Sequence, residues 1–276
     1  MSILSAVFLG LVQAATEFLP VSSTAHLLVF GELLGHSLED ARFRAFVTII
    51  QLGTTVAVIV YFRDDLFRLG SAALGGIARG RPFETHDARL AWLIVLGTLP
   101  AAIAGKLLER RIEALGNGVI AGSLVGWGLL LLVAERVALH RRTVDDVGAL
   151  DAIGVGVGQA LALVPGTSRS GATITSGMLL GFTREAAARF SFLLSVPIIL
   201  GAGLYKLVKV LPDIRGAPQW RTATLVGTFV AFAAGYLVIG WLLSYLRTRT
   251  TALFIVWRLV AGGVIAILLA VGVLPR

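Results

Sequence analysis

Long stretches without a charged residue constrain this chain more than any other feature of its sequence. The stretches that contain no Asp, Glu, Lys or Arg are 45–62, 114–134, 222–246 and 259–275. A helix that crosses a bilayer needs about 20 apolar residues. Two further apolar runs, 90–105 and 190–205, reach that length with a Lys or Arg near one end that can extend to the headgroups. The pattern predicts an all-α integral membrane protein with six full transmembrane helices.

Composition and charge exclude several other classes of protein. The chain is 57% hydrophobic and 14% charged, whereas soluble domains carry about 25% charged residues. It has no cysteine, which excludes disulfides, cysteine-bound zinc and thiolate nucleophiles. The net charge of +8 comes mainly from short segments between the apolar runs, a pattern typical of attraction to anionic headgroups. We therefore expect membrane lipids as partners and no nucleic acid.

The two halves of the chain resemble each other. Residues 17–26 and 162–171 each combine an apolar run, a proline and a row of hydroxyl side chains, and they lie 145 residues apart. Later in each half a Gly-Thr pair, at Gly97 and at Gly227, is followed by another glycine at the same spacing. The similarity predicts an internal repeat.

The predicted repeats are residues 1–143 and 144–276, which together form one membrane domain. Each half holds three full spans and one interrupted segment. If the interrupted segment enters and leaves on one face, an odd number of spans makes the second half inverted relative to the first. Inverted repeats with broken helices near the midplane are a known way to build a site inside a membrane.

Proline explains each interruption. Pro20 and Pro165 lack a backbone N–H and clash with the preceding helical turn. The broken backbone cannot face lipid, so the two re-entrant segments should meet in the interior of the protein. The hydroxyl side chains expected to cap the next short helix are those of Ser22, Ser23, Thr167 and Ser168. Two helix N-termini that point into one site would favour phosphate.

Four side chains near the breaks are candidates for catalysis: Glu17, Ser23, His26 and Arg169. An ionisable group at membrane depth is costly and usually functional, which singles out Glu17. Ser23 is a potential nucleophile, and His26, three residues later on the same helical face, is suited to proton transfer. Arg169 matches phosphate oxygens with its planar guanidinium. The alternatives are purely structural roles: helix capping, a hydrogen-bonded core histidine and an ion pair between Glu17 and Arg169.

Further polar or flexible residues around the breaks are candidates for substrate binding. They are Gln13, Ser22, Thr24, Gly166, Thr167, Ser168, Ser170 and Thr173. The remaining histidines lack metal-ligand spacing. The glycines at 154, 156 and 158 follow no predicted strand, so they indicate close helix packing rather than a dinucleotide site.

Two of these motifs resemble those of the undecaprenyl-diphosphate phosphatase family of bacitracin-resistance proteins, and the resemblance covers essentially the whole chain. Residues 13–26 resemble the family's (Glu/Gln)-xxx-Glu motif and its Ser-Ser-Thr-Gly-His continuation. Residues 165–173 resemble its Pro-Gly-x-Ser-Arg-Ser-xxx-Thr motif. Two departures occur. Gln13 takes the permitted alternative and so is not expected to be the essential base, and Ala25 stands where glycine is usual.

The resemblance implies hydrolysis of undecaprenyl diphosphate to undecaprenyl phosphate, the carrier lipid of peptidoglycan synthesis. It also implies interlocked inverted repeats in the bacterial plasma membrane, a site open to the outer face, and a divalent cation, Mg²⁺ or Ca²⁺, for which Glu17 is the candidate ligand. The segment 63–89 carries five arginines, which favours the cytoplasm for its side. Glycines at 122, 126 and 128 would permit close helix association, including a homodimer.

Two mechanisms and one other function remain open at the level of sequence. Ser23 could attack the terminal phosphorus with His26 as base, or a water molecule could attack with Glu17 as base. The alternative function is a flippase for the phosphorylated polyprenyl lipid, because transporters also use inverted repeats with broken helices. A carrier would need Arg169 but no pair of nucleophile and base.

Overall fold

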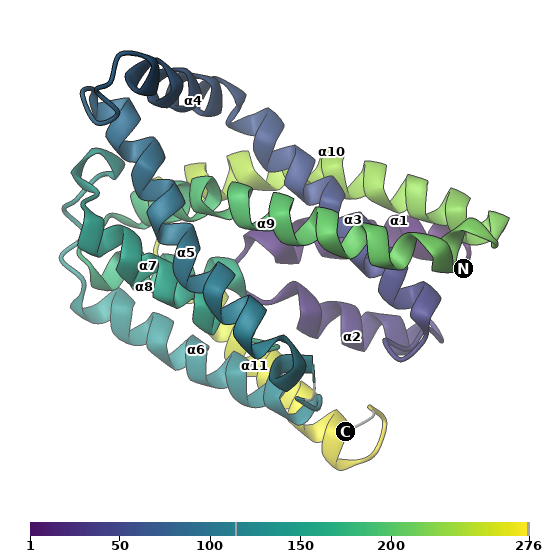
Figure 1. Ribbon diagram of the computed structural model, residues 1–276. Helices are drawn as coiled ribbons and strands as arrows, with labels where there is room; N and C mark the ends of the chain where they lie inside the picture. Colours follow the sequence, from purple (N-terminus) through teal and green to yellow (C-terminus); the bar gives the residue numbers. More distant parts are fainter. Residues whose placement is uncertain (114, 275–276) are drawn as a thin grey trace.

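The computed structural model describes residues 1–113 and 115–274, and throughout this part of the chain the regular secondary structure is helical (Figure 1). The helices are α1 (Ile3–Phe18), α2 (Ser23–Leu33), α3 (Ala41–Tyr61), α4 (Arg63–Ala78), α5 (His86–Glu113), α6 (Gly118–Val137), the short 3-10 turn η1 (Val144–Asp146), α7 (Ala149–Leu161), α8 (Arg169–Leu179), α9 (Arg184–Arg215), α10 (Pro218–Thr248) and α11 (Ala252–Ala270). One isolated bridge joins Arg142 to Phe182.

Among the described residues, six helices are long and apolar enough to cross a membrane, which confirms the predicted number of spans. They are Ala41–Tyr61, His86–Leu108, Gly118–Val137, Arg184–Ile214, Pro218–Thr248 and Ala252–Ala270. The last helix begins at Ala252, before the predicted run 259–275. It contains Arg258, which is fully buried. This charged residue therefore lies inside the span and does not mark its end. The chain is a multi-pass membrane protein.

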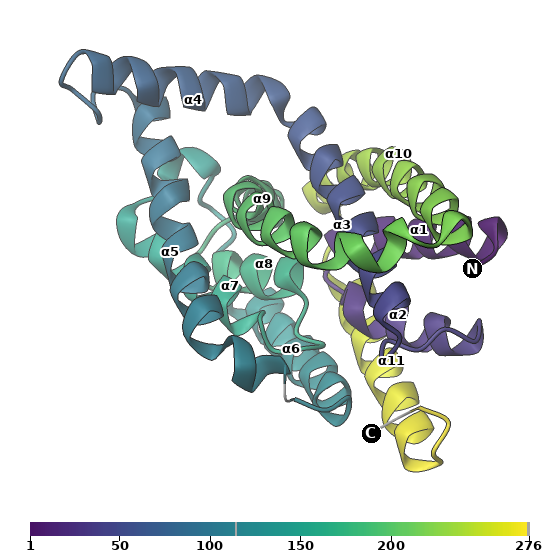
Figure 2. The ribbon, with the colours of Figure 1, turned by 45° about the vertical axis from the view of Figure 1, so that its right-hand side comes forward.

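The arginine-rich segment 63–89, which lies between two predicted spans, is mostly helical. Most of it forms α4, which runs from the end of α3 to the start of α5 along one edge of the molecule (Figure 2). Two acidic residues, Asp64 and Asp65, occupy its first turn and stabilise a helix N-terminus. Phe67 and Leu74 are exposed, so α4 presents apolar side chains as well as arginines to its surroundings.

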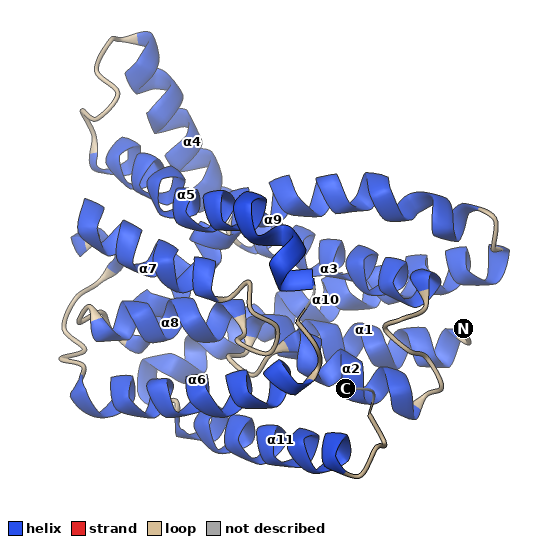
Figure 3. Cartoon of the chain, turned by 60° about the horizontal axis from the view of Figure 1, so that its bottom comes forward, coloured by secondary structure: helices blue, strands red, loops and turns tan. Residues whose placement is uncertain are grey.

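The two interrupted segments have the expected helix–break–helix form. Residues 19–22 separate α1 from α2, and residues 162–168 separate α7 from α8. Figure 1 shows α1 and α2 toward the end of the molecule that carries the N-terminus, and α7 and α8 toward the other end. Figure 3 shows α6 and α11 side by side, and close contacts between them agree with this view.

Glycines allow the first helix of each half to approach a helix of the other half closely. In α1 a Cβ on Gly10 would lie 2.7 Å from the carbonyl oxygen of Gly227 in α10. In α7 a Cβ on Gly156 would lie 2.3 Å from the carbonyl oxygen of Gly97 in α5. These glycines explain the close packing of α1 on α10 and of α7 on α5. Gly128 packs against α11, whereas no neighbouring atom lies near Gly122 or Gly126; the homodimer stays a prediction.

Replacing Gly156 by alanine should destabilise the protein, because its new methyl group would collide with the backbone of α5. We expect a cost of about 1–3 kcal/mol, typical of overpacking, seen as a lower midpoint of thermal unfolding in detergent. Gly122→Ala is the matched control, since a Cβ there meets nothing within 4 Å and alanine favours a helix. An equal change in both variants would contradict this account of the packing.

Candidate active site

The two breaks meet in the interior, as the sequence predicts. The hydroxyl of Ser170, in the first turn of α8, donates to the carbonyl oxygens of Glu17 at 3.2 Å and Leu19 at 3.0 Å. Arg258 of α11 joins both breaks from the other side, with bonds to the carbonyl oxygens of Pro20 at 3.0 Å and Thr167 at 2.8 Å. The otherwise unpaired backbone of the breaks is thus satisfied within the protein.

Glu17, in the last turn of α1, is the centre of the hydrogen bonds between the breaks. Its buried carboxylate accepts from Ser23 at 2.8 Å and from Gln13 at 3.1 Å through Oε2. Its Oε1 accepts from Arg169 at 2.7 Å and from Gln51 of α3 at 3.4 Å. The ion pair between Glu17 and Arg169, which the sequence offered as an alternative, is therefore present. Both carboxylate oxygens accept hydrogen bonds, one of them from a guanidinium.

Ser22 and Ser168 precede α2 and α8 and share an uncommon backbone conformation. Their φ angles are 75° and 69°, in the left-handed region that few residues other than glycine adopt. The hydroxyl of Ser168 accepts from the N–H of Gly171 at 3.1 Å, so the predicted cap is confirmed there. The expectation is wrong for Ser22, which makes no capping bond with its side chain, and for Ser23, whose hydroxyl donates to Glu17. It is also wrong for Thr167, whose hydroxyl has no partner in the described part of the chain.

His26 does not pair with Ser23, contrary to the expected pair of nucleophile and base. Its Nδ1 lies 2.7 Å from the carbonyl oxygen of Ser22, and its Nε2 accepts from the indole N–H of Trp257 at 2.8 Å. The imidazole and indole rings are stacked, with centroids 5.9 Å apart. Because a carbonyl oxygen only accepts, Nδ1 carries a proton, and because Nε2 accepts from Trp257, Nε2 carries none. The imidazole ring is therefore neutral. Both nitrogens are therefore engaged away from Ser23.

The second break holds polar groups that have no partner in the described part of the chain. These are Nη1 of Arg169 and the buried hydroxyl of Thr167. Buried polar groups in native structures are nearly always paired, so two unpaired groups beside the ion pair indicate a place for a ligand. Gly166 has a φ of 86° and lies against the backbone of Ile120, where a side chain would not fit.

The remaining predicted site residues differ in their surroundings. Thr173 is fully buried and bonds the carbonyl oxygen of Arg169 at 2.8 Å and the hydroxyl of Ser191 at 2.5 Å. Thr173 therefore links the first turn of α8 to Ser191 of α9. Thr24 is exposed at the start of α2. Of the residues predicted for substrate binding, Thr24 is thus the one most open to a ligand from outside.

Three residues of this region were not predicted from the sequence: Gln51, Trp257 and Arg258. Arg258 has no exposed surface, and its partners are carbonyl oxygens: those of Pro20, Ser123, Leu124, Gly166 and Thr167. The rule that singled out Glu17, an ionisable group at membrane depth, could have found Arg258 as well. No sequence signal distinguishes Gln51 or Trp257.

Replacing Arg258 by leucine should destabilise the protein strongly, because carbonyl oxygens of both breaks would lose their donor inside the protein. We expect a loss of about 3 kcal/mol or more, measured as thermal unfolding in detergent. Arg249→Leu, on the exposed segment before α11, should have little effect. A variant at position 258 as stable as that control would show that Arg258 does not hold the breaks together.

Comparison with known proteins gives a consistent result over the whole chain. Residues 6–264 match the family described as "Bacitracin resistance protein BacA". The undecaprenyl-diphosphatase of Anaeromyxobacter sp. (strain K) is 72% identical over 100% of this chain and 94% of its own length. Those of Myxococcus xanthus and Pelodictyon phaeoclathratiforme are 50% and 44% identical over 99% of this chain, and 91% and 99% of their own lengths are covered. The chain belongs to the BacA family of bacitracin resistance proteins.

Proposed function

We propose that this protein hydrolyses undecaprenyl diphosphate to undecaprenyl phosphate and inorganic phosphate, the activity for which its relatives are named. The observation that carries the proposal is the group formed by Glu17, Ser23 and Arg169. A carboxylate that accepts a serine hydroxyl at 2.8 Å and a guanidinium at 2.7 Å places a base, a nucleophile and a phosphate-binding cation together. Phosphoryl transfer depends chiefly on such positioning and charge neutralisation.

The diphosphate would lie beside the start of α8. There the unpaired Nη1 of Arg169 and the hydroxyl of Thr167 can donate to phosphate oxygens. The first N–H groups of α2 and α8 add partial positive charge. The exposed Thr24 would meet the same headgroup. The remaining candidates, Gln13, Ser22, Gly166, Ser168, Ser170 and Thr173, would shape this site through the bonds described above.

Substrate binding would also free Glu17 from its cation. When Arg169 turns to the phosphate, the carboxylate, which already accepts from Ser23, would take the proton of the Ser23 hydroxyl. The Ser23 oxygen then bonds to the terminal phosphorus, the anhydride bond breaks, and undecaprenyl phosphate leaves with the bond's electron pair. Water next hydrolyses the phosphoserine. In the rival version Glu17 deprotonates a water molecule that attacks directly.

His26 would act by position rather than as the base for Ser23. Its Nδ1–H bonds the carbonyl of Ser22, the residue with left-handed backbone at the start of α2. The imidazole can therefore hold Ser22 in this conformation and so direct the first turn of α2 toward Glu17. Trp257 fixes the ring through Nε2. This is a positioning role, in place of the proton transfer expected from the sequence.

The described residues do not fit a resident metal site. Both oxygens of Glu17 accept hydrogen bonds, and the described residues include no group of three His, Cys, Asp or Glu side chains that could hold an ion. A divalent cation, Mg²⁺ or Ca²⁺, would instead arrive on the phosphate oxygens of the substrate, as Mg²⁺ does on many phosphate compounds.

We further propose that the halves 1–143 and 144–276 are inverted repeats with re-entrant segments α1–α2 and α7–α8. Ala6 and Ala152, which are 146 positions apart, make corresponding contacts: a Cβ on Gly227 would approach the carbonyl of Ala6, and a Cβ on Gly97 would approach that of Ala152. The two glycines themselves are 130 positions apart. The left-handed Ser22 and Ser168 are also 146 positions apart. The prolines, 145 apart, differ from this register by one residue.

The end of the molecule that carries α4 would face the cytoplasm of the bacterium, because the segment 63–89 holds five arginines. The interrupted pair α1–α2 would then enter from the outer face of the plasma membrane.

A flippase for the phosphorylated lipid is the second candidate function, favoured by inverted repeats. It would need the cation of Arg169 but not the bond between Ser23 and Glu17.

Arg169→Ala should abolish release of phosphate from undecaprenyl diphosphate by the detergent-purified protein. An arginine that neutralises transferring phosphate can contribute about 10³-fold or more, so we expect at least that loss in kcat. Ser71→Ala on α4, remote from the breaks, should retain full activity. A folded wild type that releases no phosphate, with or without Mg²⁺ or Ca²⁺, would favour the flippase.

Ser23→Ala distinguishes the two mechanisms. If Ser23 is the nucleophile, the variant should lose roughly 10³-fold or more of its phosphate release, comparable to removal of other nucleophiles that act with a base. Rapid quenching of wild type with labelled substrate should then trap a phosphoserine. Near-full activity of the variant would instead assign the attack to water, with Glu17 as its base.

A further inference from the structure

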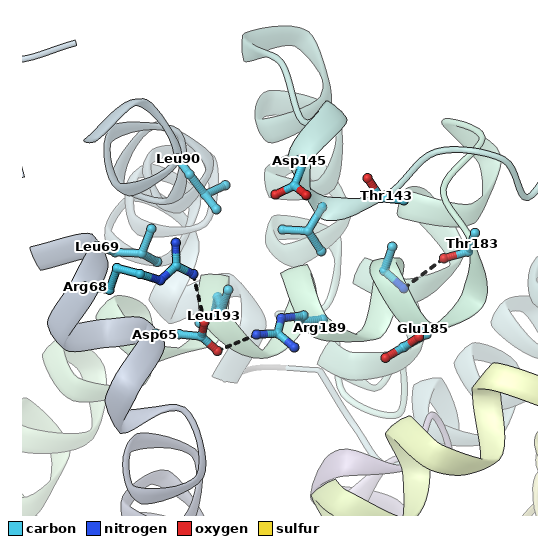
Figure 4. A pocket seen from close by; sticks show the side chains of 12 residues that line it. Asp65, Arg68, Leu69, Leu90, Thr143, Asp145, Thr183, Glu185, Arg189 and Leu193 are labelled. Atoms are coloured by element: carbon cyan, nitrogen blue, oxygen red, sulfur yellow. Dashed lines mark hydrogen bonds and ion pairs between the residues drawn. The ribbon is translucent and has the colours of Figure 1, made fainter. Parts of the chain in front are cut away.

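A polar cavity whose lining includes no residue of the breaks lies at the end of the molecule that carries α4. It has a volume of about 300 Å³ and is bounded by α4, the first turns of α5, the segment around η1, and the start of α9. Its charged side chains are Asp65, Arg68, Asp145, Glu185 and Arg189 (Figure 4). None of these side chains takes part in the site between the breaks, so the proposed hydrolysis does not explain them.

One side of the cavity carries two guanidinium groups that share a carboxylate. Asp65 accepts from Arg68 at 2.9 Å and from Arg189 at 2.5 Å, and Arg68 also donates to Asp87. Figure 4 shows these groups together on one rim. In the described part of the chain, Arg189 uses only Nη2 for hydrogen bonds. Its Nε and Nη1 therefore remain able to donate to a phosphate on a ligand.

The opposite side of the cavity carries Asp145 of η1, whose carboxylate is 84% exposed. Its Oδ1 lies 3.9 Å from Nε2 of His86. With Asp65 and Glu185, the polar cavity is lined by three carboxylates and two guanidiniums, and Arg89 adds a third guanidinium in the cavity beside it. Charges of both signs suit a zwitterion whose phosphate meets Arg189 and whose ammonium group meets Asp145.

An apolar cavity of about 680 Å³ adjoins this polar one and runs along α5. Both are lined by Leu90 and Asp145, and the apolar cavity continues past Trp92, Leu96 and Leu99. The indole N–H of Trp92 donates to the carbonyl of Pro82 at 3.1 Å, an arrangement typical of tryptophan at a membrane interface. A polar pocket that continues into an apolar groove on a membrane-spanning helix matches the two parts of a lipid.

We propose that this pair of cavities binds a glycerophospholipid with a primary ammonium headgroup, of the phosphatidylethanolamine class. The phosphate accepts from Arg189, the ammonium group donates to Asp145, and one acyl chain follows the groove along α5. A phosphatidylglycerol lacks the cation that Asp145 requires. A phosphatidylcholine carries a cation without N–H donors, so it cannot form that hydrogen bond.

The test is native mass spectrometry of the full-length, detergent-purified protein, titrated separately with phosphatidylethanolamine, phosphatidylcholine and phosphatidylglycerol of identical acyl chains. We expect one phosphatidylethanolamine to bind at least tenfold more tightly than either other lipid. Asp145→Asn should bring the affinities for phosphatidylethanolamine and phosphatidylcholine within twofold of each other. Asp64→Asn is the matched control, because Asp64 is equally exposed at 87% but lies outside the cavity, and it should keep the preference.

Arg189→Gln should weaken binding of phosphatidylethanolamine and phosphatidylcholine alike by at least fivefold, since both carry the phosphate. Thermal unfolding checks that loss of the bond to Asp65 leaves the variant folded, and Asp145→Asn does not depend on that bond. Equal binding of the three lipids by wild type, or a preference that survives Asp145→Asn, would overturn the proposal. Phosphate release by Asp145→Asn should match wild type, so the outcome is independent of the proposed hydrolysis.

Discussion

The structure depends on giving partners to backbone carbonyls where two helices break inside a membrane protein. Lipid offers no group that could accept or donate in their place. Arg258 supplies several donors from one side chain, because a guanidinium carries five N–H groups in a fixed plane. It reaches Pro20 in the first break and Thr167 in the second. One buried cation therefore makes both interruptions possible and fixes their distance from each other.

A second guanidinium, that of Arg169, is held by Glu17 rather than by carbonyls. The difference matters for function. A cation bound to several carbonyl oxygens is a structural element, whereas a cation bound to one carboxylate can exchange that partner for a phosphate. Nη1 of Arg169 is buried and has no partner in the described part of the chain. In the proposed mechanism, the exchange of Glu17 for phosphate would couple substrate binding to attack by Ser23 or water.

The sequence predicted the six spans, the breaks and the pair Glu17–Arg169, because lack of charge, proline and a buried acid are strong local signals. The predictions from sequence failed where contacts between distant residues determine the partners of a side chain. Ser23 and His26 share a helical face by spacing, yet Glu17 takes the hydroxyl and Trp257 takes the imidazole. Arg258 was read as the boundary of a span, although burial among carbonyls lets it lie within one. The charges of segment 63–89 gave no indication that most of it is helical.

The proposed repeats share a framework but divide its chemistry. At the register of 146 residues, Gln159 corresponds to Gln13, and Leu163 stands where the first half has Glu17. The amide of Gln159 is buried without a partner in the described part of the chain, as expected once its carboxylate is replaced. Arg169 likewise corresponds to Ser23. One half thus supplies the acid and the hydroxyl, and the other supplies the cation. A symmetric pair of breaks could place two acids or two cations together, and like charges at that distance would repel. Divergence of the halves is what allows a single ion pair, and hence a single site, at their junction.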